Sequence, residues 1–140
     1  MKKLIFIASV FLLLGTTSLL SQNSDELQGA WEIIYTEYAF PDTTTITTQF
    51  DNPTVKLLTK KHFAFGNQAS DGESVRGGGG TYSFDGKTYT EHVKYHRYTP
   101  LIGKSIELES KLEGDKWTIK GVVPGDNGEI HLKEIWKRIE

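Results

Sequence analysis

From residue 29 to the end of the chain, apolar and polar residues alternate in short runs separated by turn-forming residues. The pattern is clear in GAWEIIYTEY (29–38) and in EIHLKEIWKRIE (129–140). Alternation with a period of two is typical of β-strands, and this part of the chain shows no run with the period of an amphipathic helix. The chain is therefore predicted to be all-β, with eight or nine short strands.

The turn signals predict how these strands connect. Asp-Gly at 85–86 lies between two alternating runs, and Glu-Gly-Asp at 113–115 lies between two more. Both patterns are typical of antiparallel hairpins. A meander of hairpins closes most readily into a single up-and-down antiparallel β-barrel, because closure removes exposed strand edges. A two-sheet sandwich is the alternative.

The first residues have the pattern of a secretory signal peptide. Lys2 and Lys3 precede an apolar run, Leu4 to Gly15, and small polar residues follow it. This run is shorter than the ~20 apolar residues of a membrane-spanning helix. We therefore expect residues 1–21 to be cleaved and residues 22–140 to form one domain. The mature protein is expected in the periplasm or outside the cell, with no membrane span.

Charge and cysteine content exclude several classes of function. The formal net charge is −2, and it becomes −4 when the two lysines of the leader are removed. Such a chain lacks the basic excess of nucleic-acid-binding proteins. It also has no cysteine, which excludes disulfides, thiol catalysis, thiolate metal sites and a lipid-modified cysteine. Nothing in the sequence indicates the oligomeric state.

A glycine run interrupts the alternating pattern. GNQASDGESVRGGGG (66–80) has almost no apolar residues and is predicted to form a long loop. A phosphate-binding loop would lead into a helix, but here a predicted strand follows, and no Lys-Ser or Lys-Thr pair is present. The four glycines Gly77, Gly78, Gly79 and Gly80 are instead candidates for a lid over one barrel mouth.

The histidines raise the question of a metal. On a strand, His92 and His96 share the outer face, opposite Glu91, and lie about 13 Å apart at ~3.3 Å per residue, too far for one ion. A composite site that uses His62 or His131 stays open, but we expect neither a metal nor a cofactor.

The strand pattern predicts which side chains face the barrel interior. Two of them are carboxylates, Glu91 and Glu134, which require partners when buried. Arg97, Arg138 and the hydroxyls of Tyr35 and Tyr95 are available. The candidate cavity residues are Tyr35, Phe63, Phe65, Tyr89, Glu91, Tyr95, Trp117, Glu134 and Trp136.

Both ends of the predicted barrel resemble a known architecture. Gly29-Ala30-Trp31 resembles the Gly-x-Trp signature of lipocalin-type barrels, and Arg138 resembles the arginine that packs across that tryptophan. The segments GGGTYSFDGKTYTEHVKYH, LEGDKWTIKG and EIWKRIE are similar to bacterial exported lipocalin-like domains of unassigned function. The resemblance implies a calycin-type barrel closed by these residues.

Three functions are compatible with this pattern. The first is non-enzymatic binding of a small, apolar or amphipathic ligand in an aromatic cavity with Glu, Tyr and Arg as polar handles. The second is a structural or interaction protein of the cell envelope, with a barrel filled by its own side chains. The third is a hydrolase or isomerase that uses Glu91 and Glu134, although no local catalytic motif is present.

Overall fold

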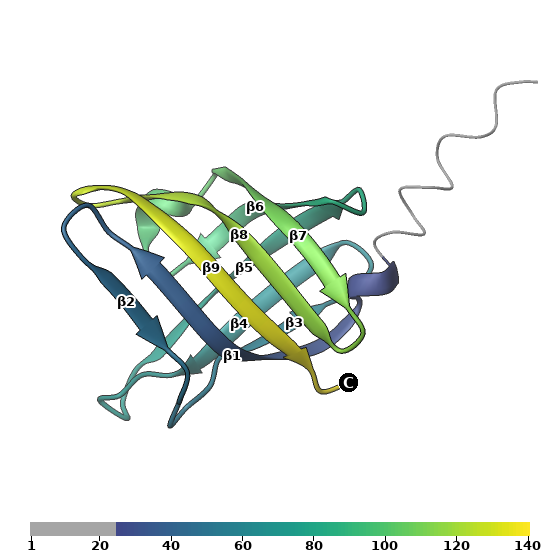
Figure 1. The fold of residues 1–140 in the computed structure, drawn as a ribbon, viewed down its shortest axis with the longest axis horizontal. Helices are drawn as coiled ribbons and strands as arrows, with labels where there is room; N and C mark the ends of the chain where they lie inside the picture. Colours follow the sequence, from purple (N-terminus) through teal and green to yellow (C-terminus); the bar gives the residue numbers. More distant parts are fainter. Residues whose placement is uncertain (1–24) are drawn as a thin grey trace, which may run out of the picture.

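Strands β1 (Gly29–Ala39) and β9 (Gly128–Arg138) come from the two ends of the domain and lie side by side, which closes the sheet (Figure 1). The computed structural model describes residues 25–140, so the predicted signal peptide and its cleavage site lie outside the described residues. The remaining elements are β2 (Thr44–Thr47), β3 (Val55–Leu58), β4 (His62–Gln68), β5 (Val75–Phe84), β6 (Thr88–His96), the 3₁₀ helix η1 (Thr99–Leu101), β7 (Ser105–Glu113) and β8 (Lys116–Gly125).

From β3 to β9 each strand pairs antiparallel with the next strand along the chain, and β1 pairs with both β3 and β9. The eight strands β1 and β3–β9 therefore form a closed up-and-down barrel. This confirms the predicted fold class, and the sandwich alternative is wrong. Within the part of the chain that the structure describes, no helix has the length and hydropathy needed to cross a bilayer.

One edge of β1 pairs with two short strands, β3 and β2, one after the other. The stretch from Gly29 to Glu32 pairs with β3, whereas the stretch from Thr36 to Ala39 pairs with β2, on the same edge of β1. Among the described strands, β2 pairs with β1 alone, and Figure 1 shows it standing apart from β3 and β4. Strand β2 thus extends the wall beside β1 and is not part of the closed eight-stranded barrel.

Two β-bulges reverse the direction of side chains. One lies in β1 between Ile33 and Tyr35, and the other lies in β6 between Val93 and Tyr95. Each inserts one extra residue, and a shift of one residue moves the following side chains to the other face. The prediction that both tyrosines face the interior is therefore wrong.

The predicted glycine loop is largely strand. Residues 62–68 belong to β4 and 75–84 to β5, so only 69–74 connect them. The four consecutive glycines pair with β4 and β6 within the barrel wall, which rules out a loop or lid at these positions. A solvent-exposed loop and a strand crowded by its neighbours can both lack apolar side chains, so composition alone did not distinguish them.

Close packing explains the glycines. A Cβ atom on Gly78 would lie 2.9 Å from the Phe65 ring and 2.6 Å from the His96 ring. One on Gly80 would collide with the backbone carbonyl of His92 at the β6 bulge. These positions require glycine, because aromatic rings and a neighbouring backbone occupy the space that a side chain would need.

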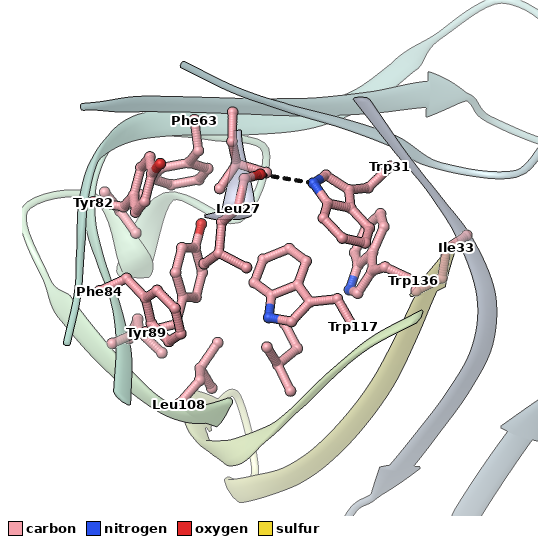
Figure 2. Close-up of a cluster of buried hydrophobic side chains, with 14 residues drawn as sticks. Leu27, Trp31, Ile33, Phe63, Tyr82, Phe84, Tyr89, Leu108, Trp117 and Trp136 are labelled. Atoms are coloured by element: carbon pink, nitrogen blue, oxygen red, sulfur yellow. Dashed lines mark hydrogen bonds between the residues drawn. The ribbon is translucent and has the colours of Figure 1, made fainter. Parts of the chain in front are cut away.

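A cluster of aromatic and aliphatic side chains fills one end of the barrel (Figure 2). Trp117 is fully buried at its centre, with ring centroids 5.4 Å from Trp31 and 4.9 Å from Tyr89. The indole of Trp31 donates a hydrogen bond to the Leu27 carbonyl at 2.9 Å, which attaches the helical turn at residues 25–27 to the barrel end. This end is therefore closed by protein.

The predicted pairing of Arg138 with Trp31 is confirmed. The guanidinium carbon lies 4.1 Å from the indole centroid, and the two residues are also cross-strand partners. Its two terminal nitrogens donate hydrogen bonds to the carbonyls of Gln28 and Glu26, both at 2.6 Å. Arg138 thus joins the last strand to the first and to the turn before it.

Candidate functional site

The opposite end of the barrel is hollow. A cavity of about 1210 Å³ opens there, surrounded by the connections β1–β2, β2–β3, β4–β5, β6–β7 and β8–β9. The side chains of its mouth include Phe40, Phe50, Tyr98 and Asp126. The aliphatic residues that line it are Ile33, Val93, Leu101, Ile106, Leu108, Ile119, Val123, Ile130 and Leu132.

A buried ion pair lies deep in this cavity. Lys56 Nζ donates a hydrogen bond to Glu91 Oε1 at 2.8 Å, and the Tyr89 hydroxyl donates to the same oxygen at 3.1 Å. Lys56 is 4% exposed and Glu91 is 9% exposed. A buried carboxylate and a buried ammonium each require such a partner.

Aromatic rings surround the ammonium group. Lys56 Nζ lies 4.8 Å from the Trp136 ring centroid. The other four rings, at 5.5 to 5.8 Å, belong to Phe63, Phe65, Tyr89 and Trp117. The negative faces of aromatic rings attract a cation, so the rings stabilise a charge that burial would otherwise disfavour.

Lys56 was not among the predicted cavity residues. It lies between Val55 and Leu57 on β3, and it alternates inward with the buried Leu58. Two signals pointed to it: the period-two spacing from Leu58, and the need of Glu91 for a cationic partner. The predicted partners were Arg97, Arg138, Tyr35 and Tyr95, and the structure pairs none of them with Glu91.

The second predicted carboxylate also lines the cavity. Glu134 accepts hydrogen bonds from the Tyr38 hydroxyl at 2.6 Å and from the Trp136 indole nitrogen at 3.0 Å. Burial, and then the adjacent Glu134 charge, raise the pKa of Tyr38 far above its usual value. Tyr38 therefore remains a neutral donor at any physiological pH.

His96 lines the cavity, although the strand pattern predicted it on the outer face. The β6 bulge turns it inward, where its ring packs 5.5 Å from that of Phe65. Its Nδ1 accepts the backbone N–H of Tyr98 at 2.8 Å, which fixes the neutral tautomer with the proton on Nε2. Burial lowers the pKa of His96; the nearby Glu91 charge opposes this shift, and the Lys56 charge adds to it.

The nine candidate cavity residues divide into three groups. Phe65, Glu91, Glu134 and Trp136 line the cavity. Phe63, Tyr89 and Trp117 belong to the buried cluster at the closed end. Tyr35 and Tyr95 lie outside: the Tyr35 hydroxyl bonds Glu37, and Tyr95 is 56% exposed.

The histidines of β6 do not share a face. His92 Nδ1 lies 2.9 Å from the Ser105 hydroxyl, whereas His96 points into the cavity. The expectation that they share one face is wrong because of the bulge between them. Within residues 25–140, no group of three or more His, Asp or Glu side chains is arranged to hold a metal ion.

The geometry defines a class: an antiparallel eight-stranded barrel closed at one end, with a cavity at the other end that reaches a buried ion pair. The chain belongs to the DUF4488 family, described as a domain of unknown function, whose family model matches residues 26–140. The match covers the whole barrel. No curated protein matches the chain.

Proposed function

We propose that this barrel binds a small, partly apolar molecule in its open end and performs no chemistry on it. The single observation that carries the proposal is the cavity of about 1210 Å³ that extends from the mouth to the Lys56–Glu91 pair. Ligand sites of proteins are typically about 300–1000 Å³, mostly apolar, with a few polar groups that orient the ligand. The aliphatic wall and the ion pair supply these two elements.

The closure of the barrel supports the same proposal. The Trp31–Arg138 contact is the feature by which the sequence resembles lipocalin-type barrels, and barrels of eight strands have room for one small ligand. We propose a lipocalin-like binder on these grounds.

The competing idea is an envelope protein whose interior is filled by its own side chains. The aromatic cluster around Trp117 fills the closed end in this way. The open end favours binding, because its aliphatic lining borders empty space. A hydrolase or isomerase finds less support, since Glu91 is paired with Lys56 and both oxygens of Glu134 accept hydrogen bonds.

The experiment combines native mass spectrometry with a blocked cavity. We expect the full chain, purified from its source cells without detergent, to carry a small molecule that is released on denaturation. It should also bind N-phenyl-1-naphthylamine, an uncharged fluorescent probe. Leu132→Trp places an indole in the cavity and should abolish both signals.

Lys133→Trp is the matched control, because Lys133 neighbours Leu132 on β9 but faces outward over the Tyr35 ring. This variant should bind like the unchanged protein. Absence of any bound molecule together with absence of probe binding would rule out a binding function.

We further propose that the protein acts after export, in the periplasm or outside the cell. The support is the basic and apolar pattern of residues 1–21. The mass of the protein recovered from those compartments should correspond to a chain that begins at about residue 22. Recovery of the intact chain from the cytoplasm would contradict this.

A further inference from the structure

We infer that the ligand is a protonated amine on an apolar body, and that Glu91 receives its ammonium group. This rests on the proposed binding function and specifies the chemistry of the ligand. Three features support it: the charge of the cavity, the free hydrogen-bonding capacity of Glu91 and the aromatic rings beside this carboxylate.

The side chains that line the cavity carry an excess of negative charge. Five carboxylates oppose three cations, a formal net charge of −2 with His96 neutral. The carboxylates are Asp42, Asp51, Glu91, Asp126 and Glu134, and the cations are Lys56, Arg76 and Arg97. At the deep end the ion pair cancels, and the charge of Glu134 remains. The field inside therefore favours a cation over an anion.

Glu91 has an unused acceptor. Its Oε1 takes both hydrogen bonds, from Lys56 and Tyr89, and no described residue donates to its Oε2. Among the described residues, every fully shielded side-chain oxygen or nitrogen has a partner. Oε2 is therefore accessible, and Glu91 lines the cavity. An ammonium group is the strongest donor that a ligand could bring to this oxygen.

The aromatic rings support the same chemistry. Trp136 and Phe65 both line the cavity and both face the Lys56 ammonium. The protein thus already stabilises one ammonium group at this depth with rings and a carboxylate. A ligand carboxylate would meet two carboxylates there, Glu91 and Glu134, and one cation, Lys56, whose charge Glu91 already balances, so net repulsion would weaken its binding.

Three probes with the same ten-carbon chain test the inference: decylamine, decanol and decanoate. Displacement of N-phenyl-1-naphthylamine at pH 7.5 measures their affinities for the full chain. We expect decylamine to bind at least tenfold more tightly than decanol, and decanoate to bind most weakly. Binding of decanol or decanoate as tight as that of decylamine would overturn the amine preference while leaving the binding function intact. Failure of all three, with no bound naphthylamine to displace, would instead remove the binding function.

Variants of Glu91 test whether this residue binds the ammonium group of the ligand. Glu91→Gln should lower the affinity for decylamine at least tenfold more than it lowers the affinity for decanol. Glu107→Gln is the control, since this exposed residue lies outside the cavity on the neighbouring strand. Should Glu91→Gln fail to fold because Lys56 loses its partner, Lys56→Met/Glu91→Gln removes both charges, and it too should lose the preference. An amine preference retained in either folded variant would overturn the role of Glu91.

Discussion

The hydrogen bond between Lys56 Nζ and Glu91 Oε1, 2.8 Å long, joins two strands that are not neighbours in the sheet. Lys56 projects from β3 and Glu91 from β6, so the pair crosses the barrel interior. It separates the filled end around Trp117 from the open cavity. The pair thus sets the depth to which a ligand can enter.

Removal of one partner should destabilise the fold strongly. Lys56→Met leaves the Glu91 charge buried without its cation, and we expect a loss of about 3–5 kcal/mol in the free energy of unfolding. Chemical denaturation measures it. Lys111→Met is the matched control, because Lys111 and Glu113 form an ion pair with side chains 68% and 62% exposed. That change should cost less than about 1 kcal/mol.

Removal of both partners should restore stability. In Lys56→Met/Glu91→Leu no charge remains to be desolvated, and we expect the double variant to unfold within about 1 kcal/mol of the unchanged protein, or above it. The same denaturation measurement applies. A double variant as unstable as Lys56→Met alone would show that packing at these positions, rather than the charge, carries the effect.

Arg138 should stabilise the closed end. Arg138→Ala uncovers the Trp31 indole and leaves the Gln28 and Glu26 carbonyls without their donor, so we expect a loss of about 1–3 kcal/mol. Thermal and chemical unfolding measure it. Lys137→Ala, at the exposed neighbouring position, should change stability by no more than about 0.5 kcal/mol. Equal effects of the two changes would contradict the closure role.

The glycine run should not tolerate a side chain at Gly80, which lies opposite the β6 bulge. In Gly80→Ala the new methyl group would collide with the His92 carbonyl, and backbone atoms cannot move aside without breaking strand pairing. We expect a loss of about 1–3 kcal/mol. Gly66→Ala on β4 provides the comparison, since its nearest neighbour would be the Arg76 carbonyl oxygen at 3.2 Å. A larger loss for Gly66→Ala than for Gly80→Ala would contradict this reasoning.

Stability should depend on pH through His96. Burial is the main cause that lowers the pKa of His96 in the folded chain, so the imidazole binds a proton more readily when the chain is unfolded. The contribution is present above the unfolded pKa of about 6.5 and is lost as the pH falls below it. Unfolding curves between pH 7.5 and 5 should show this loss, and His96→Ala should flatten it. The same slope in both proteins would assign it to other groups.

Local sequence patterns predicted much of the fold. The alternating runs predicted the strands, Asp-Gly at 85–86 predicted the β5–β6 hairpin, and Glu91 and Glu134 were correctly assigned to the interior. Asp85 Oδ1 accepts the backbone N–H groups of Lys87 and Thr88, which explains why this dipeptide turns the chain. These predictions succeeded because each depends on residues that are close together in the sequence.

The inward or outward direction of a side chain beyond a bulge required the tertiary structure. Tyr35, Tyr95 and His96 were assigned to the wrong faces because one extra residue in β1 and one in β6 shift the alternation. A bulge depends on pairing with the neighbouring strand, and no local composition marks it here. The glycine strand was mistaken for a loop for the same reason, since the Phe65 and His96 rings that require Gly78 come from other strands.

The sequence by itself determined most of the strands and the hairpins, because periodicity and turn chemistry act over a few residues. It indicated the Trp31–Arg138 closure through the resemblance of the two ends of the domain to lipocalin-type barrels. Only the tertiary structure decided where the cavity lies and that Lys56 forms its floor with Glu91. The reason is physical: a cavity exists where strands distant in sequence fail to fill the space between them, and an ion pair across a barrel depends on the register of every strand between its partners.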